Sequence, residues 1–397
     1  VIGRVYYSAL VLQKIRAGFP IFFAAINMRA GLVLMAPLLP IISKYYGLSH
    51  FQMSLLLSIP VICFSASSLL MGFLGGRASS DRIITIALIS LASASFLRIV
   101  TGVAGLFIFT IVIGISIAVM NYEIPVWVKA HVSESSGLLT GIYVTLMGVG
   151  AAISIAISVP IAESTKYSWH LSLLPWAALA SLAALYWSRR RAVIDATEFK
   201  KVIPFWKSHV IKSPIAWSLV FFFGLESMTF YGSASWLPTI LTTKDFTLRA
   251  AGGAIAFSGL LGSLVGLFFP HFIAKVKDQR LILALVSIAT GFSFFMMTVQ
   301  SGPILILWLC TSNIGISMAF PACLLLCNTK SKSPETTRSL STMMQSIGYV
   351  ISATGPFYAS SIFEVSKDWN KVLYGIVLLT FLQMAMGLIV GRSTQLD

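Results

Sequence analysis

Charged side chains are scarce in this chain. Asp, Glu, Lys and Arg make up only 10% of its 397 residues, whereas hydrophobic residues make up 57% and the mean hydropathy is +0.88. Soluble globular domains carry about 25% charged residues. The composition therefore excludes a soluble domain and indicates a protein that crosses a membrane many times.

Cysteine and histidine are also few, and this limits the chemistry available to the chain. All four cysteines lie within apolar segments, where they are expected to be small buried hydrophobic residues, so we predict neither disulfides nor a metal site. None of the five histidines falls in the middle of an apolar segment, which argues against a histidine proton relay.

Catalytic and nucleotide-binding motifs are missing as well. The sequence has no phosphate-binding Gly-Lys-Ser or Gly-Lys-Thr motif, so ATP is not expected to drive this protein directly. It also has no nucleophile elbow and no zinc-protease motif. We therefore expect no enzyme activity and no cofactor.

Basic residues outnumber acidic ones, 28 to 13, but their distribution does not indicate a nucleic-acid partner. Most of them lie in short breaks between apolar runs, on one side of the predicted membrane. The opposite side carries Lys44, Arg98, Lys166, Lys244, Arg249, Lys367 and Lys371. Because cytoplasmic loops are enriched in Lys and Arg, we expect a multi-pass protein of the cytoplasmic (inner) membrane with both termini in the cytoplasm.

The apolar runs predict an all-α membrane protein with twelve transmembrane helices. The expected helices are residues 19–43, 51–72, 82–98, 103–128, 136–162, 168–188, 215–240, 248–274, 280–299, 303–328, 339–362 and 370–391. The one long basic break, residues 189–214, is expected to be a cytoplasmic linker that contacts anionic lipid headgroups. It separates an N-terminal six-helix unit, residues 1–188, from a C-terminal one, residues 215–397.

The two halves resemble each other at a spacing of about 200 residues. Residues 114–118, GISIA, recur as residues 315–319, GISMA. The pair Leu39-Pro40 near the end of the first helix recurs as Leu237-Pro238 near the end of the seventh. Together with the six-plus-six count, these echoes predict two pseudo-symmetric six-helix bundles related by an axis along the membrane normal.

Arg29 is the most informative residue of the first helix, because it lies near the middle of a long apolar run. A charge at that depth is costly, so Arg29 is expected to face a protein interior or a watery cavity. It is either a fixed positive charge in a substrate path or a structural cation that pairs with a carboxylate or reaches an interface.

Only Glu123 and Glu226 place carboxylates well inside predicted helices, the fourth and the seventh. If two repeats surround a central cavity, helices 1, 4, 7 and 10 occupy equivalent positions, so both carboxylates could converge with Arg29. They are candidates for proton coupling, or for a structural ion pair. Other polar or aromatic residues within the predicted helices are candidates for substrate binding together with Arg29. The candidate substrate-binding residues are Arg29, Asn27, Asn121, Tyr231, Trp236, Gln345 and Tyr349.

The sequence resembles the major facilitator superfamily, and more narrowly its cyanate permease and nitroimidazole exporter branch. The residues that carry the resemblance are Asn27-Met28-Arg29, Ala36-Pro37-Leu38-Leu39-Pro40, Asn121, Pro125, Phe223-Gly224-Leu225-Glu226-Ser227, Trp236-Leu237-Pro238, Ala319-Phe320-Pro321, Gln345-Ser346-Ile347-Gly348-Tyr349 and Gly355-Pro356. The resemblance implies alternating access between two six-helix bundles, with a small anionic or nitrogen-rich substrate bound between them.

Two carboxylates depart from the pattern of that branch. Glu226 stands where the branch usually has Gln, and Glu123 where it usually has an apolar residue. These departures fit proton coupling, or a substrate with a cationic part, better than a plain anion site. The expected function is therefore a proton-coupled secondary active transporter whose partners are a small-molecule substrate, protons and membrane lipids, and which works as a monomer.

Two alternatives remain open at this point. One is an exporter of drugs, nitroheterocycles or a siderophore-like metabolite, since the same residues serve symport and antiport. The other is a non-transporting membrane sensor or scaffold on the same fold. A sensor would not need charged residues that converge on a central cavity, so the position of Arg29 and Glu226 discriminates between these alternatives.

Overall fold

The computed structural model describes residues 19–74, 79–131, 136–166, 168–189 and 205–396, and this part is almost entirely helical. In chain order the helices are Phe19–Val33, α2 (Met35–Tyr46), α3 (His50–Leu74), α4 (Ser80–Val100), α5 (Gly102–His131), α6 (Ser136–Ser164), α7 (Trp169–Ser188), α8 (Pro214–Thr242), α9 (Leu248–Ile273), α10 (Arg280–Val299), α11 (Leu305–Thr329), α12 (Pro334–Ala353), α13 (Gly355–Ser366) and α14 (Trp369–Val390), with 3-10 turns η2 (Phe205–Lys207), η3 (His209–Lys212) and η4 (Gly302–Ile304).

Helices occur at all twelve positions expected from the sequence. Within the described ranges, ten are long and apolar enough to cross a membrane, and the bent pair Phe19–Val33 and Met35–Tyr46 raises the number to 11. The position expected at 339–362 is occupied by α12 and α13, which are shorter or more polar and meet at Thr354. The all-α, multi-pass membrane fold is confirmed.

Proline explains both interrupted positions. Pro37 lacks the N–H that would bond to the Val33 carbonyl one turn earlier, and its ring crowds that carbonyl. The first helix accordingly breaks at Leu34 and bends by 41°. Pro356 stands just after the second break, which separates α12 from α13. The two breaks lie in opposite halves of the chain.

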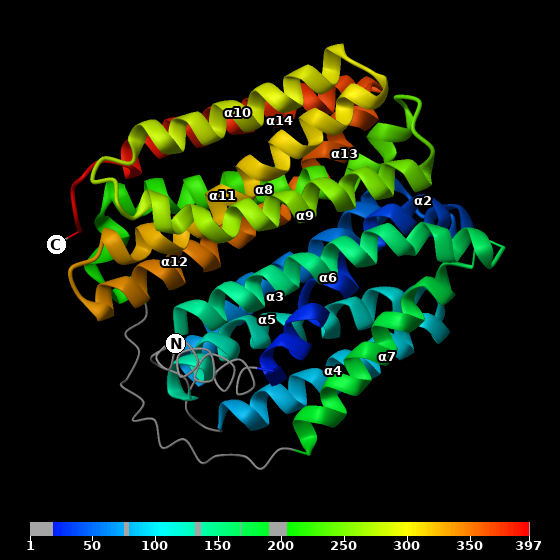
Figure 1. Ribbon diagram of the computed structural model, residues 1–397, viewed down its shortest axis with the longest axis horizontal. Helices are drawn as coiled ribbons and strands as arrows, with labels where there is room; N and C mark the ends of the chain where they lie inside the picture. The colour runs from blue at the N-terminus through cyan, green and yellow to red at the C-terminus, as the bar shows by residue number, and fades with distance from the viewer. Residues whose placement is uncertain (1–18, 75–78, 132–135, 167, 190–204, 397) are drawn as a thin grey trace, which may run out of the picture.

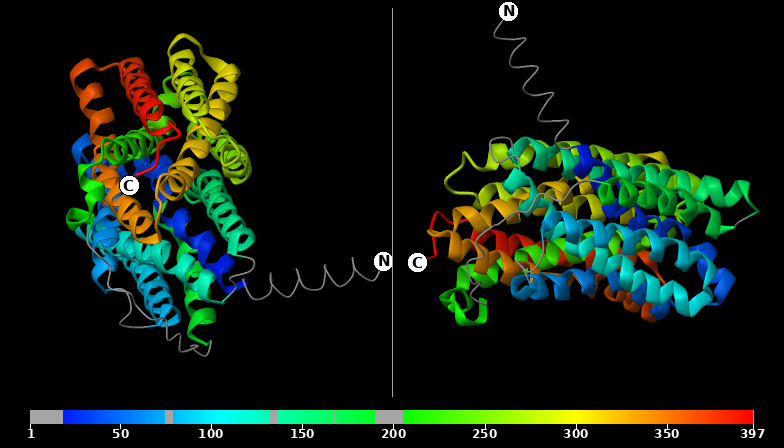
Figure 2. Two further views of the ribbon diagram at one scale, coloured as in Figure 1. Left: turned by 90° about the vertical axis from the view of Figure 1, so that its left-hand side faces the viewer. Right: turned by 90° about the horizontal axis from the view of Figure 1, so that it is seen from below.

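The helices form two bundles that lie side by side (Figure 1). The helices up to α7, coloured blue to green, make one bundle, and α8 to α14, coloured green to red, make the other. Figure 2 shows the long helices running in roughly the same direction through both bundles. We call the end that holds η2, η3 and the start of α12 the linker end, and the opposite end, with the turns at Gly47 and Gly302, the distal end.

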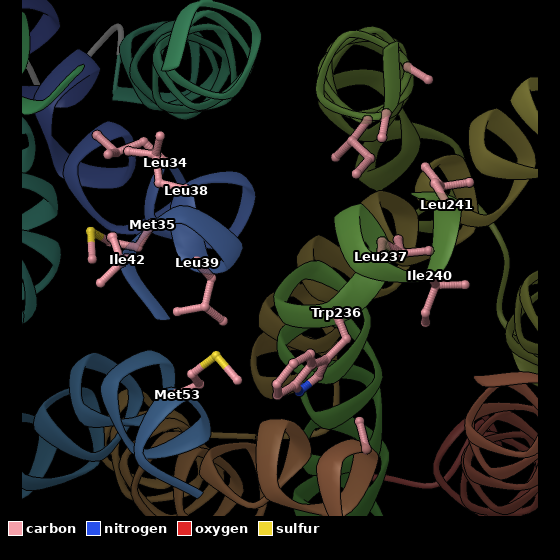
Figure 3. Close-up of a cluster of buried hydrophobic side chains, with 14 of the residues drawn as sticks. Leu34, Met35, Leu38, Leu39, Ile42, Met53, Trp236, Leu237, Ile240 and Leu241 are labelled. Atoms are coloured by element: carbon pink, nitrogen blue, oxygen red, sulfur yellow. The ribbon is translucent and has the colours of Figure 1, made fainter. Parts of the chain in front are cut away.

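Apolar side chains join the two bundles near the distal end. Leu34 at the break and four residues of α2 belong to the same buried cluster as Met53 of α3 and four residues of α8 (Figure 3). These residues are Leu34, Met35, Leu38, Leu39, Ile42, Met53, Trp236, Leu237, Ile240 and Leu241. We call this set the distal plug.

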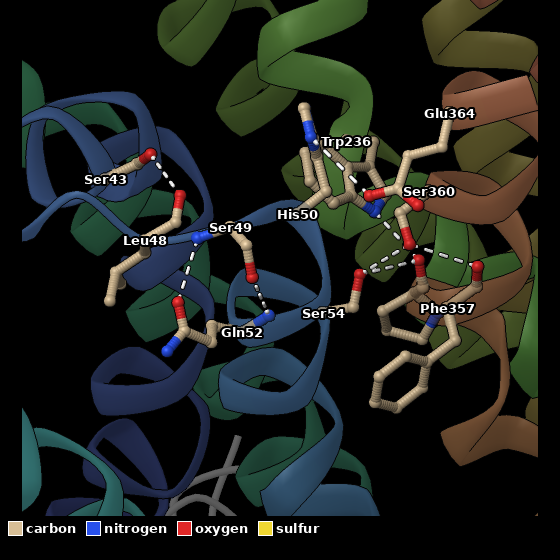
Figure 4. Close-up of polar contacts among 11 residues, drawn as sticks. Ser43, Leu48, Ser49, His50, Gln52, Ser54, Trp236, Phe357, Ser360 and Glu364 are labelled. Carbon is tan, nitrogen blue, oxygen red and sulfur yellow. Dashed lines mark hydrogen bonds and ion pairs between the residues drawn. The ribbon is translucent and has the colours of Figure 1, made fainter.

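Polar contacts reinforce this closure (Figure 4). The Ser54 hydroxyl of α3 lies 2.8 Å from the Ser360 hydroxyl and 3.1 Å from the Pro356 carbonyl, both on α13. The Trp236 indole donates to the same Pro356 carbonyl at 3.0 Å. Because Ser54 is completely buried, its bonds tie the two bundles together without competition from water.

Candidate functional site

A cavity of about 130 Å³ lies between the two bundles, next to the distal plug. Residues of Phe19–Val33, α2, α3, α4, α5 and α6 line one side, and residues of α8, α9 and α11 line the other. Met35 and Leu237 belong to both the lining and the distal plug. A space of this size holds on the order of ten water molecules, which suits a small solute.

The lining is mostly apolar, with a few polar groups and two charges. Within the described part of the chain, the charged lining residues are Arg29 and Arg98, and no carboxylate lines the cavity. Tyr231 of α8, together with Asn313 and Ser317 of α11, supplies polar atoms from the C-terminal bundle. A pocket with few polar groups and a net positive charge favours a small anionic or electron-rich ligand.

Arg29 is half-buried on the wall of this cavity. Its guanidinium carbon lies 5.9 Å from the centroid of the Phe230 ring, a distance at which a cation is attracted to an aromatic face. Its guanidinium forms no ion pair with any carboxylate of the described residues. The Arg29 charge is therefore available to a ligand.

Glu226 lies beside the cavity rather than in its wall. Its side chain is 3% exposed, and its carboxylate accepts a hydrogen bond of 2.8 Å from the Ser227 hydroxyl. Glu226 is close enough to Arg29 for the two charges to interact, and both also interact electrostatically with Tyr231 and Tyr349. One cation, one carboxylate and two phenols from three helices are thus brought together.

Glu123 is not part of this group. Its side chain is 4% exposed and interacts with Ser80, the first residue of α4 at the linker end. The structure therefore places the two candidate proton-coupling carboxylates in different environments: Glu226 is near Arg29, and Glu123 is near the start of α4.

The other candidate substrate-binding residues do not line the cavity. Asn27 is buried and donates to the Phe23 carbonyl of its own helix at 3.0 Å. Asn121 is exposed. Gln345 donates to the Ser341 hydroxyl at 3.0 Å.

The two remaining aromatic candidates, Tyr349 and Trp236, pack against other side chains of the protein. Tyr349 packs edge-on against Phe64 of one bundle and Phe223 of the other, with ring centroids 5.5 and 5.1 Å away. Trp236 belongs to the distal plug, where its indole bonds to Pro356. Of the seven candidate substrate-binding residues, Arg29 and Tyr231 are the two that line the cavity.

Arg98 lines the cavity but was not a candidate, because its position at the end of the expected helix 82–98 suggested a cation that reaches the membrane surface. It is in fact 2% exposed, and one of its nitrogens, Nη2, donates to the Gly31 carbonyl at 3.2 Å. The apolar pair Ile99 and Val100, which extends α4 beyond Arg98, is the signal in the sequence that could have placed this residue inside the bundle.

Metal-ligating groups are not gathered anywhere in the described part of the chain, where no three His, Cys, Asp or Glu side chains are close enough to hold a metal ion. All four cysteines are buried as free thiols.

Comparison with known families gives a match to the Major Facilitator Superfamily over residues 21–356. Curated relatives include the 2-nitroimidazole transporter of Escherichia coli (strain K12), 29% identical over 95% of this chain and 95% of the relative. The cyanate transport protein CynX of the same organism is 26% identical over 87% of this chain and 89% of its own length. The uncharacterized transporter YycB of Bacillus subtilis (strain 168) is 28% identical over 94% of this chain and 92% of its own.

Solved structures agree with this match at the level of the fold. A bacterial homolog of the human lysosomal transporter Spinster, in an inward-facing conformation, aligns with a TM-score of 0.74 at 14% identity, over 96% of this chain and 97% of that one. The fucose:proton symporter FucP of E. coli aligns with a TM-score of 0.67 at 14% identity, over 94% and 98%. The resemblance seen in the sequence is thus confirmed.

Proposed function

Because the chain belongs to the Major Facilitator Superfamily, we propose that it is a secondary active transporter that couples proton flow to the movement of a small, anionic or nitrogen-rich solute. The observation that carries this proposal is the group around the cavity: an unpaired Arg29 in the wall and a buried Glu226 next to it. In this proposal the bundles 1–188 and 215–397 rock about the cavity, and the basic segment 189–214 connects them. Residues 190–204 of that segment lie outside the described residues.

The orientation in this proposal follows the distribution of basic residues. The linker end, which carries most of the Lys and Arg, faces the cytoplasm, and the distal end faces outward across the cytoplasmic membrane. The distal plug would then close the cavity from outside.

Arg29 and Glu226 provide a simple means of coupling. An ionised Glu226 would compete with the substrate for the positive charge of Arg29. A protonated Glu226 would release that charge to the substrate, so binding a proton and binding an anionic group would favour each other. Tyr231, which lines the cavity and interacts with both charges, would contact the substrate.

A second candidate substrate class is supported by one relative. The 2-nitroimidazole transporter is similar to this chain over nearly the full length of both proteins. A nitro group is electron-rich and accepts hydrogen bonds, so Arg29 and Tyr231 would suit a nitroheterocycle as well. Export of such a compound by proton antiport would require the proton and the compound to compete for the site, the opposite of the coupling described above, so the pH dependence of binding separates the two cases.

The proposal is tested by solute uptake into proteoliposomes with an imposed pH gradient, using radiolabelled cyanate and 2-nitroimidazole as probes. We expect the wild-type protein to move at least one probe, and Arg29→Met to lower the rate at least tenfold. The matched control is Arg249→Met, an exposed arginine at the start of α9, which should transport like the wild type. Normal transport by Arg29→Met would contradict the proposed role of Arg29.

A further inference from the structure

Arg98 is the least satisfied polar side chain near the cavity. Its Nη2 group bonds to Gly31, but Nε and Nη1 have no hydrogen-bond partner within the described part of the chain. Since Nε carries one hydrogen and Nη1 carries two, three of the five N–H donors of this guanidinium are unpaired. The side chain is nevertheless 2% exposed and lines the cavity.

A structural role does not account for this arrangement. The bond to the Gly31 carbonyl, just before the break at Leu34, needs only one neutral donor. A buried cation without a counter-ion destabilises a folded protein, because its lost hydration is not replaced. The electrostatic surroundings of Arg98 contain no acidic group among the described residues, unlike those of Arg29, which include Glu226.

No side chain of the neighbouring helices accepts a hydrogen bond from the unpaired donors of Arg98 within the described part of the chain. Pro60 and Val61 of α3 line the same cavity and offer no side-chain acceptor. Thr110 of α5 lines it too; its hydroxyl donates to the Leu106 carbonyl at 2.6 Å, and it accepts no hydrogen bond from Nε or Nη1 of Arg98. The cavity is therefore the place from which an acceptor for the unpaired donors can come.

We propose that Arg98 is a second anion-binding residue of the transport site, and that it takes an oxyanion or carboxylate group of a small substrate that enters the cavity. This inference rests on the proposed function and narrows its substrate class to anions. The bound anion supplies both the counter-charge and the acceptors that the described residues do not provide. Arg29 and Arg98, from different helices, then hold the substrate together, which explains why the lining carries two cations and no carboxylate.

Binding is measured as the rise in melting temperature of the purified full chain when sodium cyanate, nitrate, formate or benzoate is added, with sodium chloride at equal ionic strength as the reference. Ligands that bind only the folded state raise its stability as their concentration exceeds Kd. At least one of the four anions should stabilise the wild type, and Arg98→Met should weaken its apparent affinity at least tenfold. Arg249→Met, the exposed control, should bind like the wild type.

The same samples without anion separate a ligand-binding role from a structural one. If Arg98 serves to bind a ligand, the melting temperature of Arg98→Met should equal or exceed that of the wild type. The change removes an unpaired buried charge and keeps most of the side-chain volume. If Arg98 is only structural, the same change lowers the melting temperature and leaves the affinity for anions unaltered, and the proposal is wrong.

Arg98→Lys provides a second test that does not depend on the behaviour of the Met variant. Lysine keeps the charge and can still donate to Gly31, but it has three donors instead of five and no planar fork. We expect it to bind the anion several-fold more weakly than the wild type, and an unchanged affinity would overturn the proposal. If the wild type responds to none of the anions yet transports 2-nitroimidazole, this inference fails while the proposed function stands.

Discussion

Gly148 of α6 allows the two bundles to meet at the cavity, and replacing it tests that contact. A Cβ atom added at Gly148 would lie 2.3 Å from the Ser263 hydroxyl and 2.7 Å from the Ser263 Cβ, on α9 of the other bundle. Rotation of the Ser263 hydroxyl relieves the first clash but not the second. Overpacking of this kind costs about 1–3 kcal/mol. Gly148→Ala should therefore lower the free energy of unfolding by about 1–3 kcal/mol.

A double-mutant cycle isolates this contact from other effects of the two substitutions. Ser263→Gly removes both clashing atoms, at a cost of a few tenths of a kcal/mol in helix propensity. The free energy of unfolding is measured by equilibrium unfolding in mixed micelles. The loss in the double variant Gly148→Ala/Ser263→Gly should be about 1–3 kcal/mol smaller than the sum of the losses in the two single variants. Gly253→Ala on the same helix as Ser263 is the control, because nothing lies within 4 Å of a Cβ added there. Strict additivity of the two changes would show that these helices do not touch as described.

Three further predictions concern other contacts. Gly262→Ala and Gly266→Ala should each lower the melting temperature, because the added Cβ would lie 2.6 and 2.5 Å from backbone oxygens of α11, whereas Gly253→Ala should not. Ser54→Ala should weaken the distal closure by about 0.5–1.5 kcal/mol, read as faster labelling of a cysteine introduced at Val33 by an impermeant thiol reagent added from outside. Unchanged labelling would exclude a part for Ser54 in closure. Hydrogen bonds from Arg280 lower the pKa of Asp278 to about 2, below its ordinary 3.8, so any stabilisation by this exposed pair should persist at neutral pH and disappear only as the pH falls through about 2. A carbon-13 NMR titration of labelled aspartate carboxyls, compared with Asp278→Asn, measures that value directly.

Most of the fold could be predicted because the bilayer imposes a simple rule. A helix must be about 20 apolar residues long to cross it, so the limits of helices such as α10 are visible in the sequence. The breaks at Leu34 and Thr354 were harder to predict, although Pro37 and Pro356 mark them. A proline inside a transmembrane helix is often tolerated without a break, because neighbouring groups satisfy the freed carbonyl.

The candidate site could be predicted only in part, because the sequence gives depth in the membrane but not direction within a bundle. Arg29 was singled out because a charge at mid-depth is unusual, and it does line the cavity. Glu123 met the same criterion, but its helix turns it toward Ser80. Arg98 failed the criterion, because its place near the end of a helix suggested a surface charge.

The proposed coupling through Glu226 is tested most directly by separating solute exchange from gradient-driven accumulation. Proteoliposomes containing Glu226→Gln should still exchange labelled for unlabelled solute, because the neutral side chain leaves Arg29 free to bind it. They should no longer accumulate solute under a pH gradient, since no proton is carried. Glu123→Gln is the matched control, because Glu123 is a buried carboxylate away from Arg29. This variant should both exchange solute and accumulate it under a pH gradient. Full accumulation by Glu226→Gln would contradict the account.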